Sequence, residues 1–494
     1  MASLPLFFLF SLLALPSFSG KLRPPFLINS LILPFLLLSV SNLSFILIAD
    51  ANISNKVGVC YGQLGDNLPT STGSVDVIRQ LKANRVKLYD ANPDILKALR
   101  NTDIQVSIMV PNQVIPNIYS HQPEADKWVM TNVVPYYNET KIRYILVGNE
   151  ILSNQPNSTW FQLVPAMRRI RRSVNKFRLK KVKVGTPLAM DMLESSYPPS
   201  NGTFRSDLAG PVIKPLLDFL NKTNSFFFID AYPYFPWSGQ PDKIRLDYAL
   251  LQQTSFTYTD PGSGLTYTNL LDQMIDAVIF AMDRLGYMDV RVFIAETGWP
   301  NDCDLDQIGA SVYNAATYNR NVVKKLTSGL GTPARPGAAI PAFIFALYNE
   351  NQKTGPGTER HFGLFYPNRT SVYEIDLSGK TPESEFKPLP MPTNNELYKG
   401  KIWCVVAPGE NRTAVAEALS WACGQGNRTC DLLQKGKACY GSKSLELQAS
   451  YAFSSYWAQF KSLGGSCYFN GLAVQTKTDP RYGNCEFPSV TLKA

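Results

Sequence analysis

Two glutamates, Glu150 and Glu296, have the surroundings that most clearly suggest chemistry. Each ends an apolar run, Tyr144-Ile-Leu-Val-Gly-Asn-Glu150 in one case and Val292-Phe-Ile-Ala-Glu296 in the other. Ionising a carboxyl group at the end of a buried strand is costly unless something compensates for it. A salt bridge to a nearby Lys or Arg is one explanation. The other is a pair of carboxyl groups, one protonated and one ionised, as hydrolysis of a glycosidic bond requires.

The neighbouring residues fit this second explanation. The pKa of the acid must be raised and that of the nucleophile kept low, so the two environments should differ. Asn149, directly before Glu150, is suited to hydrogen-bonding a sugar 2-hydroxyl, a contact that strengthens in the transition state. The chain has only two histidines, His121 and His361, which excludes a His-rich metal centre. We expect no metal and no cofactor, and we interpret His361 as structural.

The elements that must position these residues alternate between short β-rich runs and longer helical patterns, from Val57 to about Asp376. This alternation predicts a parallel sheet. The eight expected strands are Val57–Tyr61, Arg85–Tyr89, Gln105–Val110, Ile142–Gly148, Lys181–Gly185, Phe226–Ala231, Val290–Ala295 and Ile340–Leu347. The clearest expected helices are Trp160–Lys176, Asn269–Leu285 and Leu305–Leu326.

Eight such units favour a (β/α)8 TIM barrel, in the α/β class, with reactive groups at the carboxyl ends of the strands. A doubly wound sheet is the alternative, but no glycine-rich phosphate loop follows the first strand. Several aromatic residues follow strand ends, where they could line a cleft and stack on sugar faces or instead pack against the barrel rim. They are Tyr61, Tyr89, Tyr232, Tyr234, Phe235 and Trp299. Of these, we expect Tyr61, Tyr89, Tyr232 and Trp299 to bind substrate.

Two segments resemble the signatures of plant family-17 glycoside hydrolases, the endo-β-1,3-glucanases. They are Val147-Gly-Asn-Glu150 and Phe293-Ile-Ala-Glu-Thr-Gly-Trp-Pro-Asn301. The resemblance extends from Lys56 to about Asp376. Further matches are Gly58-Val-Cys-Tyr-Gly62, Val86-Lys-Leu-Tyr-Asp90, Asp230-Ala-Tyr-Pro-Tyr-Phe235 and Ala346-Leu-Tyr-Asn-Glu-Asn-Gln-Lys353.

This resemblance implies the barrel fold and a retaining mechanism. It also implies that Glu150 is the acid/base and Glu296 the nucleophile, with Glu350 and Lys353 in supporting roles. A secreted endo-hydrolase of β-1,3-glucan, with callose as the obvious plant wall substrate, is the function we expect. A glucan-binding wall protein with weak or no catalysis is one alternative. A transglycosylase with the same site is another.

The cysteine distribution changes sharply near residue 400. Six of the eight cysteines lie between Cys404 and Cys485, an even number in a short segment, which predicts a disulfide scaffold with fifteen possible connectivities. Cys60 and Cys303 are expected to be free thiols. Before this segment, residues 377–400 carry four prolines and no apolar period, as in an extended linker.

The cysteine-rich segment, residues 401–487, resembles the X8 domain, also called carbohydrate-binding module family 43. The matching residues include Trp403-Cys-Val-Val, Trp421-Ala-Cys-Gly and Ala449-Ser-Tyr-Ala-Phe-Ser-Ser-Tyr-Trp457. Gln448 stands where members of that family often have His. The resemblance implies three bridges, Cys404–Cys467, Cys423–Cys430 and Cys439–Cys485. We expect residues 488–494 to be a tail.

The N-terminal residues 1–51 predict a secretory leader. Lys21 and Arg23 precede an apolar run that ends at Ala49-Asp50-Ala51, a cleavage pattern, and a retained membrane anchor is the alternative. The barrel would then begin at residue 52. The last residues include no apolar tail of the GPI type, so we expect a soluble wall protein, membrane-associated only if the leader is retained. Candidate glycosylation sites are Asn52, Asn138, Asn157, Asn201, Asn221, Asn368, Asn411 and Asn427.

The charge composition limits the kinds of partner that we expect the protein to bind. The net charge is +9, but the densest basic cluster, Arg168 to Lys183, has the spacing of a solvated helix face followed by a strand, so nucleic-acid binding is not expected. We expect β-1,3-glucan as the partner, no stable membrane anchor, and a monomer.

Overall fold

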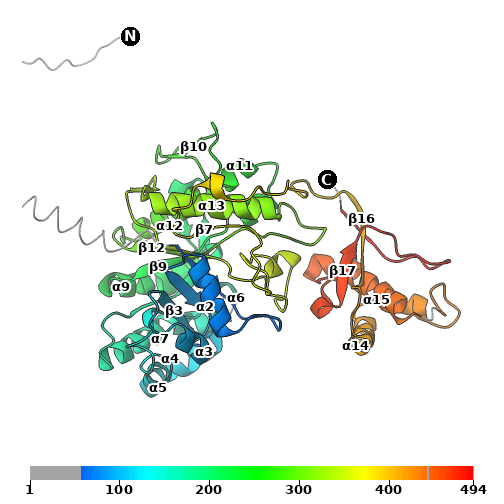
Figure 1. The fold of residues 1–494 in the computed structure, drawn as a ribbon, viewed down its shortest axis with the longest axis horizontal. Coiled ribbons are helices and arrows are strands. Elements are labelled where there is room, and N and C mark those ends of the chain that lie inside the picture. Colours follow the sequence, from blue (N-terminus) through cyan, green and yellow to red (C-terminus); the bar gives the residue numbers. More distant parts are fainter. Residues whose placement is uncertain (1–56, 155, 442–443, 493–494) are drawn as a thin grey trace, which may run out of the picture. The chain divides into compact units, whose positions relative to one another are not determined.

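The structure is a computed structural model that describes residues 57–154, 156–441 and 444–492 (Figure 1). The expected leader and the Asn52 sequon lie outside the described residues. Within the described ranges, no helix is both long and apolar enough to cross a membrane.

Nine short segments form one parallel sheet in the order β5-β4-β3-β2-β1-β15-β12-β9-β6. They are β1 (Val57–Tyr61), β2 (Arg85–Leu88), β3 (Gln105–Val110), β4 (Lys141–Val147), β5 (Lys183–Gly185), β6 (Pro187–Ala189), β9 (Phe226–Asp230), β12 (Arg291–Thr297) and β15 (Ala342–Ile344). The eight expected strands are all present, with shifts of a few residues at their ends.

The fifth expected strand explains how nine segments form an eight-stranded barrel. Only Thr186 separates β5, which pairs with β4, from β6, which pairs with β9. One stretch of chain therefore connects both edges of the sheet and closes it. The likeness to a TIM barrel is thus confirmed, and the doubly wound alternative is excluded because such a sheet stays open.

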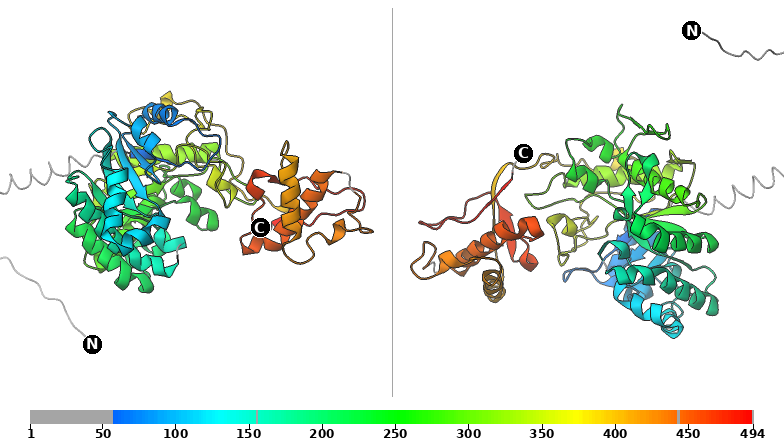
Figure 2. Two further views of the ribbon diagram at one scale, coloured as in Figure 1. Left: turned by 90° about the horizontal axis from the view of Figure 1, so that it is seen from below. Right: turned by 180° about the vertical axis from the view of Figure 1, so that it is seen from behind.

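Helices lie around the outside of these strands (Figures 1 and 2). The longer ones are α2 (Ser71–Gln80), α5 (Gln122–Asn132), α7 (Asn157–Lys176), α9 (Lys214–Lys222), α12 (Leu270–Arg284) and α13 (Val312–Ser328). Their apolar faces and the outward-facing residues of the strands form the main core. Inside the barrel Phe293 stacks between Phe228 and Phe343, with ring centroids 5.0 and 5.1 Å away.

Helix α13 begins later than the expected start at Leu305. The Ser311 side chain accepts a hydrogen bond from Asn314 N, which caps the helix at that point. Gly309 just before it has φ +72°, a conformation that a helix excludes. Residues 305–311 therefore form a loop beside the barrel mouth.

The C-terminal module has its own small sheet and core. Strand β16 (Gly400–Val406) pairs antiparallel with β17 (Ala473–Thr476) and β18 (Val490–Leu492). Helix α15 (Leu445–Phe460) packs on β16, and helix α14 (Arg412–Cys423) packs on α15. The expectation that residues 488–494 form a tail is wrong, because residues 490–492 form an edge strand of this sheet. A module this small is stapled by three disulfides, which are the pairs implied by the X8 resemblance: Cys404–Cys467, Cys423–Cys430 and Cys439–Cys485.

The proline-rich segment between the modules is mostly irregular, as expected, but it is held to the barrel near its end. Asn394 O accepts from Gly309 N at 2.7 Å, and Asn395 Oδ1 accepts from Asn314 Nδ2 at 2.6 Å. These bonds fix the segment at the N-terminus of α13, so this end of the linker is attached rather than free.

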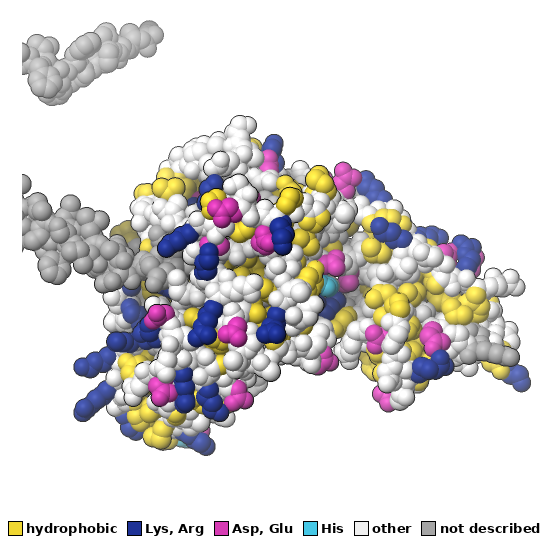
Figure 3. Space-filling view, viewed as in Figure 1, with side chains coloured by type: hydrophobic (Ala, Val, Ile, Leu, Met, Phe, Trp, Pro, Cys, Tyr) yellow, Lys and Arg dark blue, Asp and Glu magenta, His cyan; other side chains and the backbone are white. Residues whose placement is uncertain are grey.

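The surface drawn in Figure 3 carries Lys and Arg interspersed with Asp and Glu, and hydrophobic side chains gather on the module. The module exposes several large apolar side chains, among them Trp421, Tyr440, Leu463 and Val474. Aromatic side chains exposed in this way can stack on flat ligands such as sugars.

Candidate active site

A cleft of about 500 Å³ lies at the carboxyl ends of the barrel strands. Its lining includes seven of the expected site residues: Tyr89, Asn149, Glu150, Tyr232, Glu296, Glu350 and Lys353. These residues come from the ends of β2, β4, β9 and β12 and from the loop after β15. Because parallel strands place their carboxyl ends at one face of the barrel, residues far apart in sequence meet there.

Both carboxylate oxygens of Glu296 are held by hydrogen bonds. Oε1 accepts from Lys87 Nζ and from the Tyr89 hydroxyl, each at 2.6 Å, and Oε2 accepts from the Tyr232 hydroxyl at 2.6 Å. The residue is buried. A carboxylate fixed at both oxygens is oriented before any substrate arrives.

Glu150 is presented by an unusual turn of the backbone. Gly148 has φ +74° and Glu150 itself has φ +46°, in the left-handed region. A Cβ on Gly148 would lie 2.8 Å from Ile115 Cδ1, so only glycine fits. Asn112 fixes the residue between them, because its side chain accepts from Asn149 N at 2.8 Å and donates to Asn149 O at 3.0 Å.

The two glutamates differ in acidity, as a catalytic acid and a nucleophile require. Burial, reinforced by the negative charge of Glu296, raises the pKa of Glu150 to about 7. Burial alone would also raise the pKa of Glu296, but the Lys87 charge and the hydrogen bonds from Lys87, Tyr232 and Tyr89 outweigh it and lower that pKa. Below about pH 7, Glu150 therefore keeps its proton while Glu296 is ionised.

Lys87 is the main residue that the sequence interpretation missed. It is fully buried, and its Nζ lies 2.6 Å from Glu296 Oε1, 3.4 Å from Asn149 Oδ1 and 4.0 Å from Asp230 Oδ1. The alternation of side chains along a strand could have identified it, because this alternation places Lys87 on the same inward face of β2 as Arg85 and Tyr89.

Asp230 is a second buried carboxyl group below the cleft. Burial, followed by the charge of Glu296, raises its pKa well above the ordinary value. Lys87 therefore has Glu296 as its ionised partner, whereas the neighbouring Asp230 favours its own protonated, neutral form. This division favours the ion pair between Lys87 and Glu296.

Glu350 also lines the cleft and is fixed by the loop after β1. Its Oε1 accepts from Leu64 N at 2.7 Å, and its Oε2 lies 3.8 Å from Lys353 Nζ. A Cβ on Gly62 would lie 2.4 Å from Glu350 Oε1, so the close approach requires glycine. Burial raises the pKa of Glu350, and the Lys353 charge opposes the rise.

Two aromatic expectations are wrong. Trp299 is fully buried, donates from Nε1 to Gly309 O at 2.8 Å, and packs against Tyr234, Trp237 and Tyr318. Tyr61 is also buried, and its hydroxyl donates to Ser74 Oγ at 2.9 Å. Both rings fill space between a strand and its covering helices, so neither lines the cleft.

Other rings take the expected place. Phe235, whose role the sequence left open, lines the cleft, whereas Tyr234 is buried and bonds Ile308 O. Cleft residues that the sequence interpretation did not single out are Gln63, Leu64, Asp90, Phe345, Glu359 and Phe362. Most follow strand ends, so extending the strand-end reading by a few residues could have found them.

The remaining candidates have ordinary surroundings. His361 Nδ1 lies 2.8 Å from Gly357 O in the loop after β15. Cys60 and Cys303 are outside the three disulfides, and burial raises the pKa of each thiol. Among the described residues, no group of three or more His, Cys, Asp or Glu side chains is arranged to hold a metal ion.

Comparison with protein families gives two matches. Residues 57–377 match the model of glycosyl hydrolases family 17, and residues 402–474 match the X8 domain. Together they cover both modules seen in the structure.

Individual proteins show the same likeness. The chain is 52% identical to "Probable glucan endo-1,3-beta-glucosidase A6" of Arabidopsis thaliana over 443 residues, which covers 89% of this chain and 92% of that protein. It is 37% identical to "Glucan endo-1,3-beta-glucosidase 13" of the same plant, covering 91% and 88%. Among solved structures, "CJP38, a beta-1,3-glucanase and allergen of Cryptomeria japonica pollen" is 39% identical with a TM-score of 0.62, covering 65% of this chain and 99% of that one.

Proposed function

Because this chain belongs to glycosyl hydrolases family 17 and is a glucan endo-1,3-β-glucosidase, we propose that it cuts internal bonds of wall β-1,3-glucan, callose, with Glu150 as acid/base and Glu296 as nucleophile. The observation that carries these roles is the contrast between the two carboxyl groups of one cleft. Glu296 is ionised and held at both oxygens, whereas Glu150 has a pKa of about 7.

In the first step a Glu296 oxygen forms a bond to the anomeric carbon, and the glycosidic C–O bond breaks. The Glu150 proton passes to the leaving oxygen. The Asn149 amide beside the acid is suited to hydrogen-bond the 2-hydroxyl of the sugar in the cleft. The bonds from Tyr89 and Lys87 to Oε1 leave Glu296 without rotational freedom, so little reorganisation precedes attack.

In the second step the Glu150 carboxylate takes a proton from water, whose oxygen attacks the same carbon and breaks the ester to Glu296. Two inversions retain the β configuration. Removal of the proton from Glu150 is favoured once the negative charge of Glu296 has been consumed in the ester, because that charge raises the pKa of Glu150. A sugar hydroxyl in place of water would give transfer instead of hydrolysis.

The test is a time course of the purified protein on linear β-1,3-glucan, with product lengths and the anomeric configuration of the first products measured. We expect the average length of the products to fall steadily with time, and the new reducing ends to be formed in the β configuration. Products longer than the starting oligomers would indicate transglycosylation. Unchanged glucan would favour the binding protein without catalysis.

We further propose that the X8 module binds insoluble β-1,3-glucan. The support is its family and the exposed indole of Trp421, which is 49% accessible on a module with several large apolar side chains at its surface. In a pull-down of the full chain, Trp421→Ala should lower binding to the insoluble polymer. Arg412→Ala, a surface change on the same helix α14, should bind as the unchanged protein does.

The proposed location is the cell wall. Three disulfides are typical of proteins that fold in an oxidising compartment, which is consistent with secretion. Retention would come from glucan binding and from the net charge of +9. High salt or soluble β-1,3-glucan should then release the protein from walls, whereas a requirement for detergent would point to a retained membrane anchor.

A further inference from the structure

The loop that follows strand β15 carries two charged side chains into the cleft. Lys353 and Glu359 both line it, and Lys353 Nζ also lies 4.0 Å from the centre of the Phe345 ring. The short helix η5 (Gly357–Arg360) ends this loop. How these two side chains face the substrate depends on what holds the loop.

Arg360 holds the loop from its outer side. Its Nη1 donates to Lys353 O at 3.2 Å and to Gly355 O at 3.1 Å, so one guanidinium fixes both ends of the turn. Asp304 reinforces it, because Asp304 Oδ2 accepts from Gly357 N at 2.8 Å and lies 3.9 Å from Arg360 Nη2.

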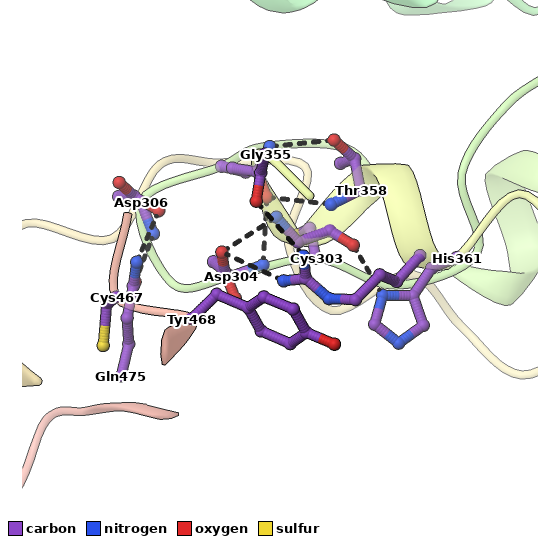
Figure 4. Close-up of polar contacts among 12 residues, drawn as sticks. Cys303, Asp304, Asp306, Gly355, Thr358, His361, Cys467, Tyr468 and Gln475 are labelled. Carbon is purple, nitrogen blue, oxygen red and sulfur yellow. Dashed lines mark hydrogen bonds and ion pairs between the residues drawn. The ribbon is translucent and has the colours of Figure 1, made fainter. Parts of the chain in front are cut away.

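The X8 module supplies the next contact. The Tyr468 ring lies over the Arg360 guanidinium, with Cζ 3.6 Å from the ring centre, and the Tyr468 hydroxyl donates to Asn351 O. Figure 4 shows Tyr468 beside the loop that carries Gly355 and Thr358. The ring thus covers one face of the Arg360 guanidinium. A planar cation stacked on a ring and bonded in its own plane has little freedom to rotate.

A second set of contacts secures the module beside this loop. Gln475 and Asp306 bond reciprocally, with Nε2 donating to Oδ1 at 2.9 Å and Oε1 accepting from Asp306 N at 3.2 Å (Figure 4). Lys461 pairs with the other oxygen of Asp306, and Leu305 packs against the module core. Asp306 and Asp304 belong to one barrel loop, so the same segment contacts both the module and Arg360.

We propose that the X8 module is a positioning element for the catalytic cleft as well as a glucan-binding domain. Through Tyr468 on Arg360 it fixes the loop of residues 353–360, and so the direction in which Lys353 and Glu359 meet the sugar chain. The inference rests on the proposed function for its effect on turnover, but the ordering of the loop is independent of catalysis. The module should therefore influence the cutting of soluble oligosaccharides, for which anchoring to a polymer gives no advantage.

The test uses the full chain with Tyr468→Ala, beside Tyr468→Phe and Tyr440→Ala. Phe retains the ring over Arg360, and Tyr440 is an exposed tyrosine of the same module with no contact to the barrel among those described. Amide hydrogen exchange of residues 353–361 and KM and kcat on soluble β-1,3-gluco-oligosaccharides are measured. Tyr468→Ala should speed exchange in this loop and raise KM several-fold, while the other two variants match the unchanged protein.

A charge exchange provides a second test if Tyr468→Ala does not fold. Asp306→Lys should produce the same two effects, and Asp306→Lys with Lys461→Asp should restore both. The positioning role would be overturned if Tyr468→Ala changed neither the amide exchange of the loop nor KM. It would also be overturned if Tyr440→Ala changed both as much as Tyr468→Ala does. If the protein without substitutions left all oligosaccharides intact, the proposed function would be refuted. The amide exchange of the loop would still show whether the module positions it.

Discussion

The Lys87 ammonium group lies 2.6 Å from Glu296 Oε1, and both side chains are buried. Removing two charges from water is expensive, and a buried pair stays favourable only when further hydrogen bonds satisfy it. Here Tyr89 and Tyr232 supply those bonds to the carboxylate. Glu296, the proposed nucleophile, is thus kept ionised by a buried ion pair.

Replacing Lys87 by Met should raise the pKa of Glu296, because burial then acts without the opposing charge. The acidic limb of the kcat/KM profile should move upward by about one to three pH units, the effect expected of a close opposite charge. Lys82→Met, which removes an exposed lysine that pairs with Asp376 and does not line the cleft, is the control. An unmoved acidic limb in Lys87→Met would contradict the role assigned to this lysine.

The two glutamates should respond differently to amide replacement. Glu296→Gln should abolish turnover of every substrate, because no other group can form the ester. Glu150→Gln should still form the ester from aryl glucosides with good leaving groups, which need no acid. Steady-state and burst kinetics on activated and unactivated substrates measure the difference, and identical behaviour of the two variants would show that the roles are misassigned.

The pKa of Glu150 fixes the alkaline side of the activity profile. A raised pKa of about 7 means that the acid is protonated below pH 7 and loses its proton as the pH rises through that value. Turnover of glucan should therefore fall about tenfold per pH unit well above the pKa. In Glu150→Gln, with an activated aryl substrate, this alkaline limb should disappear. A limb that persists would belong to another group.

Gly148→Ala should cost stability and activity together. The residue has φ +74° and its new Cβ would meet Ile115, so we expect a loss of about 1–3 kcal/mol in the free energy of unfolding. Because the turn presents Glu150, kcat should fall as well. Gly239→Ala, where a Cβ meets nothing within 4 Å, is the matched control for denaturant unfolding and for kcat. Equal effects of the two changes would rule out the conformational argument.

The order of the barrel strands and the two carboxyl groups at their ends could be predicted from the sequence alone. Apolar runs that end in Asn149-Glu150 and Glu296 place these residues at strand ends, and parallel strands bring such ends to one face. The six clustered cysteines likewise predicted a stapled module, since a small domain has too little core to be stable without bridges. These inferences depend only on local period and spacing.

Which side chains touch one another could be seen only in the folded protein. Lys87 and Glu296 are 209 residues apart, and only closure of the barrel through β5 and β6 brings them to hydrogen-bonding distance. The same holds for Trp299, which follows a strand end like the cleft residues but is covered by Trp237 and Tyr318. The period of a strand tells which face a side chain takes, whereas its neighbours depend on how distant elements pack against that face.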